Sequence, residues 1–514
     1  MSARSEEGAL RAWAFALALI VLCLPIHSPD LFWHLSAGRW IAAQGLIPTS
    51  DPFSFTRFGA PWIDFEWLAQ ILWYGIHEVA GLRGLWALKA AMLVAVFIPI
   101  DGLMRDKGAS PTARAAGLAL WSCAALASAD LRVDLFSAGL FALLLRRLEA
   151  GKASFLFGFT LFTLWGNLHA GFPLGLALYA AYAIFVPRPA ALGAEFCGAL
   201  LGTLLNPYGL EIYRVIVAHG HDSIGRYVRE WGPVDWRMGY HRPLIAALIG
   251  GTAASWAARR HAPALAAVTV ALALVTVVSS RFGIYFAAAA AGVLAVGFPR
   301  PHAFRVAGGL VLASMLLGSA TRNTAWGRAF SDVYVARRAV NFVAAERDAF
   351  GPLRVYNTYE WGGYLGWCLG RNGLVYGDGR YLFHSQLFEL ETALTGAGPM
   401  NEFVGRNRFD ALLIRNYPTQ LRGELSFPDG ARVTLTRPWY ASYLPRSRWA
   451  LVYWDEQALV FVDRAKVATG WLSAHEYRWV RPGDEEALIA ALSHGLAPAG
   501  EVSAERARRT DMPR

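Results

Sequence analysis

Acidic and imidazole side chains are concentrated in one polar stretch that directly follows an apolar segment. They are Asp30, Asp51, Asp64, Glu66 and Glu78, together with His27, His34 and His77. A carboxylate beside hydrocarbon loses its hydration, so its pKa rises unless a cation or a metal compensates. Carboxylates in such surroundings act as general bases or metal ligands, which makes this stretch the first candidate for chemistry.

Two of these acids also have a purely structural interpretation. Asp30 follows Ser28-Pro29, a helix-entry signal, and its charge would interact with the dipole of the helix that starts there. Asp51 precedes Pro52 and would cap the turn that the proline starts. The sequence leaves both interpretations open.

Further polar residues interrupt or end the later apolar segments. They are Asp130, Arg132, Asp134, Asn167, His169, Asn206 and Arg281. Ionisable residues at membrane depth are costly and are functional candidates by default. His169 and Arg281 are expected to face a shared external cavity, where the planar guanidinium would suit a phosphate group. Asn206 precedes Pro207 and is more often simply a helix end.

Two short helices are predicted to position the acids of the first loop. Residues 30–43 place Leu31, Leu35 and Ile41 on one apolar side, and residues 66–79 are rich in tryptophan and leucine and end before Gly81. Helices with one apolar side lie in the plane of the membrane interface. Both helices are therefore expected at the external boundary of the bilayer.

The remaining N-terminal sequence predicts a polytopic membrane protein. Of the 514 residues, 55% are apolar and 17% charged, and a span needs about 20 mostly apolar residues. Eleven segments approach this: 9–26, 84–104, 113–129, 133–148, 153–168, 171–186, 190–206, 243–258, 263–280, 282–298 and 304–320. The first is read as a retained span, because no small-residue cleavage site follows it.

Lysine and arginine in alternate connections predict the orientation. They cluster at the N-terminus and near residues 105–114, 146–152, 188, 259–260 and 300–305, and such clusters face the cytoplasm. The 207–242 loop contains five arginines although it is predicted to be external, but the remaining connections together favour the predicted orientation. The N-terminus is thus predicted to be cytoplasmic, and the first loop (27–84) and the C-terminal part external.

The C-terminal part has a different character. Short β-like runs at 353–356, 373–376, 411–414, 450–454 and 458–462 alternate with helical stretches such as 331–349. We expect a transmembrane domain over 1–320, one external α/β domain over 321–497 and a disordered tail over 498–514. The net charge of +10 lies in short clusters between apolar segments, so nucleic acid is not an expected partner.

Several segments together resemble a known family. They are "DLFWHLSAGRW…IPTSDPFSFT…PWIDFEWLAQ", "WGNLHAGF", "LLNPYGLEIY" and "YNTYEWGGYLGW…VYGDGR". A first span, a long external loop with an early Asp, about ten further helices and an external α/β domain resemble the GT-C superfamily of integral membrane glycosyltransferases. The resemblance covers most of the chain and extends to bacterial GT-C-like proteins of undefined substrate, so it implies a bacterial inner membrane.

The resemblance implies a reaction and roles for particular residues. GT-C enzymes transfer a sugar from a polyprenyl phosphate or pyrophosphate to an external acceptor, with a first-loop acid as base or metal ligand. Here that role falls on Asp30, with Asp64 and Glu66 as further catalytic candidates. The expected substrate-binding residues are His34, Asp51, His169, Arg281, Trp361, Asp378 and Arg380. The partners would be the lipid-linked donor and a glycan, lipid or protein acceptor, and a divalent metal is an open option.

The sequence differs from the family pattern at one motif, and two further alternatives, one structural and one functional, stay open. Trp361 is followed by Gly362-Gly363 where oligosaccharyltransferases hold a Trp-Trp-Asp motif, which speaks against an asparagine-sequon acceptor. The "VYGDGR" turn is equally compatible with an internal contact between Asp378 and Arg380. The alternative function is a non-catalytic membrane protein or transporter of a lipid or glycan, although neither repeat symmetry nor charged midplane helices support it.

Overall fold

The computed structural model describes residues 24–125, 130–185, 189–219, 229–298, 329–350, 354–370, 374–417, 419–426, 430 and 432–510. The chain forms two compact units, each of which is described by itself. The helical unit contains residues 1–28, 37–47 and 63–331, and the α/β unit contains residues 29–36, 48–62 and 332–514.

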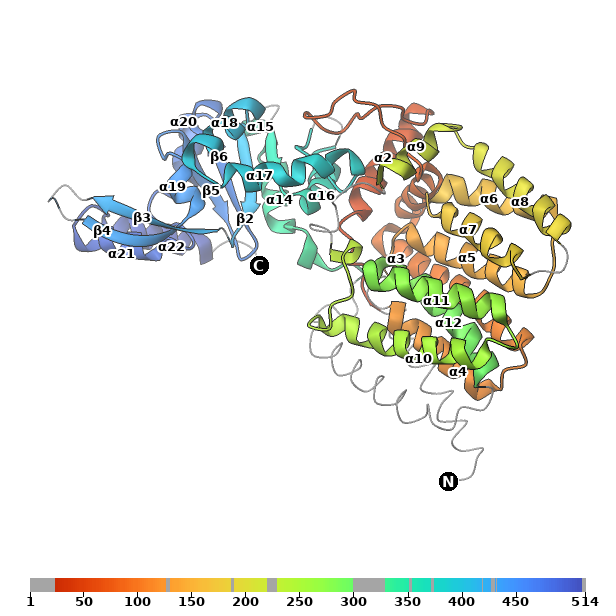
Figure 1. Cartoon of the computed structure of the whole chain (residues 1–514). Coiled ribbons are helices and arrows are strands. Elements are labelled where there is room, and N and C mark those ends of the chain that lie inside the picture. Colours follow the sequence, from red (N-terminus) through yellow and green to blue (C-terminus); the bar gives the residue numbers. More distant parts are fainter. Residues whose placement is uncertain are drawn as a thin grey trace. The chain divides into compact units, whose positions relative to one another are not determined.

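The helical unit is built mainly from apolar helices (Figure 1). They are α3 (Trp67–Asp106), α4 (Pro111–Ala125), α5 (Asp134–Glu149), α6 (Phe155–Leu168), α7 (Phe172–Ala183), α8 (Pro189–Leu204), α9 (Glu211–His219), α10 (Arg242–Ala258), α11 (Pro263–Val278) and α12 (Gly283–Gly297). Nine of the eleven predicted segments coincide with helices of this set. The segments 9–26 and 304–320 fall largely or wholly outside the described residues, so the number of spans stays a prediction.

Two helices among the described residues are long and apolar enough to cross a membrane by composition, namely Trp67–Asp106 and Ser280–Gly297. The first is interrupted at Gly81, whose φ of 58° and ψ of −155° are non-helical. A left-handed φ is accessible to glycine at little cost, so the predicted stop at this residue is a break between two helical halves.

Close helix packing in this unit depends on glycine. In α8, a Cβ on Gly198 or Gly202 would collide with the backbone oxygen of Phe155 or Phe159 in α6. In α6, a Cβ on Gly158 would in turn meet the backbone of Glu195. Small residues allow helix backbones to approach closely, which is the usual way that membrane helices gain packing energy.

Basic residues in the predicted cytoplasmic connections are paired with acids. Arg114 Nε lies 2.7 Å from Asp101 Oδ1, and Arg146 Nε lies 2.8 Å from Asp106 Oδ2. Lys107 also contacts Glu149. These pairs connect α3 to α4 and α5 at one end of the helical unit.

The α/β unit is organised around a four-stranded sheet of order β1-β2-β6-β5. The strands are β1 (Val355–Asn357), β2 (Ala411–Arg415), β5 (Trp449–Trp454) and β6 (Ala458–Asp463). β1 and β2 are parallel, whereas β6 runs antiparallel to both β2 and β5. These strands match four of the five predicted runs, and the fifth contributes Val375, which bridges to Val355 and Ser54.

The hairpin of β3 (Gln420–Ser426) and β4 (Arg432–Pro438) forms a second sheet (Figure 1). The helices of the unit are α14 (Arg337–Ala345), α15 (Arg347–Phe350), α16 (Tyr359–Leu369), α17 (Glu389–Ala393), α18 (Ala397–Asn407), α19 (Trp439–Tyr443), α20 (Thr469–His475), α21 (Glu485–Ser493) and α22 (Ala499–Thr510). The predicted helical stretch 331–349 is thus divided between α14 and α15.

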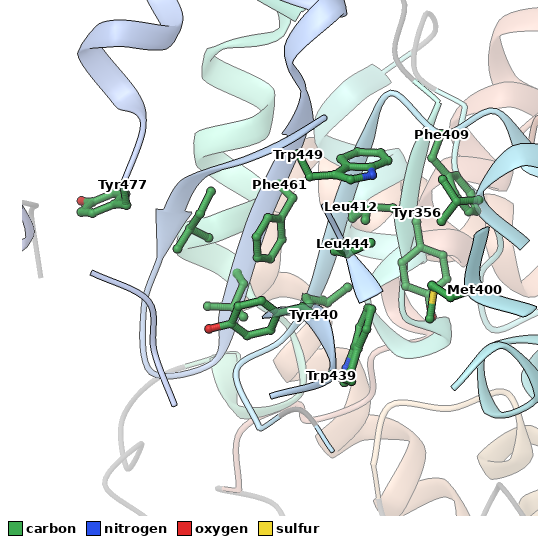
Figure 2. Packing of buried hydrophobic residues seen from close by; sticks show 14 of the residues in the cluster. Tyr356, Met400, Phe409, Leu412, Trp439, Tyr440, Leu444, Trp449, Phe461 and Tyr477 are labelled. Atoms are coloured by element: carbon green, nitrogen blue, oxygen red, sulfur yellow. The ribbon is translucent and has the colours of Figure 1, made fainter. Parts of the chain in front are cut away.

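The core of the α/β unit is aromatic. Figure 2 shows Tyr356 and Phe409, Trp439 and Tyr440, and Trp449 and Phe461 among the buried side chains. Tyr356 and Phe409 have ring centroids 5.5 Å apart and lie almost perpendicular to one another. Edge-to-face rings of this kind add stability beyond the area they bury.

Two expectations about domain limits are wrong. The predicted disordered tail (498–514) instead contains α22 over 499–510, where Val502 is buried in the core and Glu505 accepts hydrogen bonds from the backbone N–H groups of residues 478–480. The boundary near residue 320 also fails to separate the units, because residues 29–36 and 48–62 of the first loop pack with the α/β unit. Phe55, for example, donates its N–H to Val375 O at 3.1 Å.

Candidate functional site

Asp134, the first residue of α5, is the centre of a charged network in the helical unit. Its Oδ1 lies 2.6 Å from Arg281 Nη2 and 3.0 Å from His169 Nε2. Its Oδ2 accepts a second bond from Arg281 Nε at 3.1 Å. The carboxylate therefore joins the start of α5 to the residue after α6 and to the short 3-10 turn η4 (Ser280–Phe282) before α12. His169 and Arg281, which the sequence predicts to face one external cavity, both contact the Asp134 carboxylate.

The network continues from His169 to Ser137, one turn along α5 from Asp134. Ser137 Oγ lies 2.7 Å from His169 Nδ1 and accepts a bond from Trp165 Nε1 at 2.6 Å. An indole N–H can only donate, so the serine hydroxyl is free to donate to His169 Nδ1, and Nε2–H then donates to Asp134. A neutral imidazole satisfies every donor and acceptor in this chain of bonds.

The order Ser137, His169, Asp134 is that of a hydrolase triad, but its surroundings differ. Ser137 is 0% exposed, so no substrate can reach its hydroxyl. A Cβ on Gly171 would collide with Ser137 Oγ, which shows how tightly the serine is enclosed. A nucleophile must reach the reacting atom, and this arrangement instead fixes His169 and Arg281 in place.

Arg281 keeps one donor group for other partners. The ring of Trp231 lies 4.6 Å from its Cζ. Nε and Nη2 bond to Asp134, and within the described part of the chain no acceptor is bonded to Nη1. Arg132 and Glu230 form a second forked pair beside it, with Nη2 2.6 Å from Oε1. The guanidinium is thus held rigidly with one side available, as a phosphate contact requires.

The start of α3 lies beside the end of α6. Trp67 Nε1 donates to Asn167 Oδ1 at 2.9 Å, which brings Glu66 to the same end of the helical unit as His169. Asp64 accepts a bond from Gln70 Nε2 at 2.7 Å. Asp64 and Glu66 are 2% and 8% exposed. Both catalytic candidates are therefore buried, and their location at the external boundary stays a prediction.

In the α/β unit, Arg380 joins two carboxylates in a buried clasp. Its Nε lies 2.8 Å from Asp378 Oδ1, its Nη2 2.9 Å from Asp378 Oδ2 and its Nη1 2.7 Å from Asp51 Oδ1. Asp51 also accepts backbone bonds from Phe53 and Ser54 at 3.0 and 3.2 Å. Both structural alternatives considered for these residues, a turn cap at Asp51 and an internal Asp378–Arg380 contact, are observed.

Burial governs the electrostatics of the clasp. The rings of Trp62 and Phe53 lie 4.6 and 5.1 Å from Arg380 Cζ and exclude water from it. Burial raises the pKa of Asp378, and the charge of Asp51 acts in the same direction against the opposing effect of Arg380. Burial alone would lower the pKa of Arg380, but the two carboxylates more than offset it and the pKa is raised. The three side chains satisfy one another, which is the geometry of a structural element.

Asp30 is the half-exposed acid of the first loop. Trp33 Nε1 lies 3.3 Å from its Oδ1. A Cβ on Gly379 would collide with the same oxygen, so the "GDG" turn packs directly against the carboxylate. Tyr359 donates its hydroxyl to Gly379 O at 2.8 Å and fixes that turn.

The "YNTYEWGGYLGW" motif supplies the packing behind Asp30. Gly363 in α16 lies against the backbone of Trp33 and Pro29, where a Cβ would be 3.0 Å from Trp33 N. Gly362 faces the backbone oxygen of Gly377. Trp361 is buried, with Arg415 Cζ 5.6 Å from its ring. The motif allows α16 to approach the start of the first loop, and this explains its glycines without an acceptor role.

His34 is also placed by packing. It is 3% exposed, and its ring stacks on that of Trp33 with centroids 3.6 Å apart. Sequence reasoning did not assign roles to Ser137 or Trp165. The available signal was the spacing of Asp134 and Ser137, which are three residues apart and therefore share one face of α5.

A metal was an open option for this site. Among the residues that the structure describes, no group of three or more His, Cys, Asp or Glu side chains is arranged to hold a metal ion. Asp134, Asp51 and Asp378 have arginine partners instead. The side chains present do not fit a metal centre, and the proposal below uses only the residues described here.

No family model and no curated protein matches the chain. Among solved structures, it is similar to ArnT from Cupriavidus metallidurans, a GT-C glycosyltransferase, bound to undecaprenyl phosphate. That alignment has 15% identity and a TM-score of 0.49, and covers 91% of this chain and 99% of the other. The apo structure of the same protein gives 16% identity and the same TM-score and coverage. At this identity the function is argued from residues of this chain.

Proposed function

We propose that this chain is a membrane glycosyltransferase that moves a sugar from a polyprenyl-phosphate-linked donor to an acceptor outside the membrane. The observation that carries the proposal is the accessibility of Asp30. Asp51, Asp64 and Glu66 are 1%, 2% and 8% exposed, whereas Asp30 is half-buried and held by Trp33 and the Gly379 turn. A general base must be both fixed and reachable, and of these four acids Asp30 meets both conditions.

In the proposed reaction an acceptor hydroxyl attacks the anomeric carbon of the donor sugar. Asp30 accepts the hydroxyl proton while the new carbon–oxygen bond forms. The bond between the anomeric carbon and the phosphate oxygen breaks, and its electron pair leaves with the polyprenyl phosphate. Charge that develops on the leaving phosphate needs a fixed cation, and the sequence resemblance assigns that role to Arg281 of the helical unit.

The rest of the proposal follows the sequence resemblance. The protein would lie in a bacterial inner membrane, with its N-terminus in the cytoplasm and the α/β unit outside. The acceptor would be an external glycan, lipid or protein. Arginine pairs at the end of the helical unit formed by α3, α4 and α5 support this orientation, since basic residues accumulate on the cytoplasmic side.

The proposal is tested with membranes that contain the full-length protein and labelled polyprenyl-phosphate sugars. Asp30→Asn is compared with the wild type and with Asp348→Asn, whose carboxylate is 96% exposed. We expect Asp30→Asn to lower transfer by about 100-fold or more, because general base catalysis contributes roughly 10²–10⁴. Asp348→Asn should transfer at the wild-type rate.

Two results would count against the proposal. Unchanged transfer by Asp30→Asn would remove this residue from the chemistry. If the wild-type protein transfers no sugar from any donor, the non-catalytic alternative, movement of a lipid or glycan, would be favoured.

A further inference from the structure

In the α/β unit, two nitrogens of the buried Arg481 guanidinium lack acceptors among the described residues. The residue is 3% exposed, and within the described part of the chain neither Nε nor Nη1 has a hydrogen-bond partner. Buried charged donors in folded proteins are almost always bonded, because leaving one without an acceptor costs its full desolvation energy. An orphaned buried guanidinium therefore indicates a place where an anion binds.

The Arg481 guanidinium lies near rings of the aromatic core. Arg481 Cζ lies 6.0 Å from the centroid of the Phe461 ring. Tyr440 and Phe461, which Figure 2 shows next to each other, have centroids 5.1 Å apart. Tyr440 donates its hydroxyl to the Pro482 carbonyl. The rings pack near the guanidinium but offer no hydrogen-bond acceptor to its Nε and Nη1.

Nearby carboxylates are already bonded to other arginines. Asp484 Oδ1 and Oδ2 accept bonds from Arg437 at 2.8 and 2.6 Å. Glu476 accepts two bonds from Arg464. The oxygens of these acids thus bond to Arg437 and Arg464, and their charges offset only part of the desolvation that lowers the pKa of Arg481.

A second arginine without a carboxylate partner approaches the same place. Arg446 donates Nη1 to the carbonyl of Arg478 at 3.2 Å, which brings it beside the segment that carries Arg481. Burial lowers the pKa of Arg481 to about 10, and the charge of Arg446 acts in the same direction. Two cations held close together favour binding of a doubly charged anion.

We propose that Arg446 and Arg481 form a site for a phosphate group on the α/β unit. Two planar guanidinium groups match the oxygen geometry of phosphate, and the exposed Arg446 provides access to the buried Arg481. The phosphate belongs either to a free ion or sugar phosphate or to a lipid headgroup. The site is separate from the residues proposed for sugar transfer.

Thermal unfolding of the purified full-length protein in a neutral detergent tests the site. Inorganic phosphate is compared with chloride at equal ionic strength, and soluble short-chain phosphatidylglycerol is the second probe. The variants are Arg446→Met and Arg481→Met, with Arg432→Met on β4 as control, because its side chain is 71% exposed. Arg481→Met removes an unsatisfied buried charge and should fold at least as well as the wild type in chloride.

We expect phosphate to raise the wild-type Tm by about 2–4 °C over chloride. Both site variants should lose that rise, and Arg432→Met should keep it. A larger shift with phosphatidylglycerol than with phosphate would identify the lipid headgroup as the source, and the reverse would identify a soluble phosphate. No phosphate-specific shift of Tm in the wild type, or an undiminished shift in both site variants, would overturn the proposal.

Discussion

Arg281 and Asp134, which are 147 residues apart in the chain, are joined by two nearly parallel hydrogen bonds of 3.1 and 2.6 Å. This fork ties the start of α5 to the turn before α12. His169 shares the same carboxylate, so one acid orients both basic groups that the sequence singled out. The fork is therefore the element on which the geometry of this end of the helical unit depends.

Replacing Asp134 should show how much its two hydrogen bonds to Arg281 contribute to the free energy of unfolding. Asp134→Asn leaves Arg281 without its charge partner, and we expect a loss of about 3–5 kcal/mol, the usual result of breaking a buried pair. Asp101→Asn breaks a more exposed pair with Arg114 and should cost about 1 kcal/mol or less. Thermal unfolding of both variants in the same detergent measures the difference. Equal losses would show that the fork is no more important than a surface pair.

The Arg380 clasp predicts a dependence of stability on pH. In Arg380→Met, Asp51 and Asp378 remain buried together without a cation, so the pKa of Asp378, already raised by burial in the wild type, should rise further. The folded state then binds more protons than the unfolded state above the ordinary pKa of Asp, and stability falls as pH rises. The stability gap to the wild type should therefore be wider at pH 8 than at pH 5.

Arg347→Met serves as the control for this experiment. Its side chain is 60% exposed and neighbours the exposed Asp348, so its effect should be small and the same at both pH values. The prediction fails if the difference in stability between the wild type and Arg380→Met stays constant or becomes smaller from pH 5 to pH 8.

Gly362 of α16 should tolerate no side chain where it packs against the turn that contains Gly377. Gly362→Ala places a Cβ against the backbone oxygen of Gly377, and overpacking against backbone typically costs about 1–3 kcal/mol. Gly405→Ala in α18 meets nothing within 4 Å and should be neutral or stabilising by roughly 0.4–1 kcal/mol. Chemical unfolding compares the two. The packing explanation fails if Gly362→Ala is as stable as Gly405→Ala.

Trp33 should influence the rate of sugar transfer because its N–H holds the Asp30 carboxylate in position. Trp33→Phe retains the ring but removes the N–H that lies 3.3 Å from the carboxylate, and we expect transfer to fall roughly 3–10-fold. Trp236→Phe, at a tryptophan that is 68% exposed, is the matched control. The measurement is the transfer rate at saturating donor. A wild-type rate in Trp33→Phe would mean that this bond does not orient Asp30.

Glu505 should be needed for the C-terminal helix to dock. Its carboxylate accepts three backbone N–H bonds, at 2.8, 3.0 and 2.8 Å. Glu505→Gln replaces one acceptor oxygen by a donor and should destabilise the α/β unit by about 1–3 kcal/mol. Glu501→Gln affects a single exposed bond to Trp479 and should cost less. Limited proteolysis near residue 498 reports the difference, and equal cleavage rates would contradict it.

The periodicity of the sequence was sufficient for the local elements. Apolar runs predicted nine helices of the helical unit, and β-branched runs predicted the strands of the main sheet. The hairpin of β3 and β4 was missed because its strands mix polar and apolar residues, although Pro428-Asp429-Gly430 between them is typical of a turn.

Contacts between distant segments were beyond the sequence. Asp51 and Arg380 are 329 residues apart, and no local pattern indicates that they meet. The same holds for Ser137 and His169, whose pairing depends on how α5 packs against α6. Residue types alone identified His169, Arg281 and Asp30 as candidates, but the partner of each was decided by tertiary packing.

The α/β unit combines residues 29–36 and 48–62 with residues 332–514, and this order in the chain affects how the protein folds during synthesis. Residues 48–62, with the hydrophobic side chains of Phe53 and Trp62, leave the ribosome long before Arg380 exists to cover them. At about 5–20 residues per second, synthesis of the intervening residues 63–379 takes roughly 15–60 s. During that interval the nascent loop carries uncovered aromatic surface, so biosynthesis of this protein should depend on a chaperone that shields the early segment until translation ends.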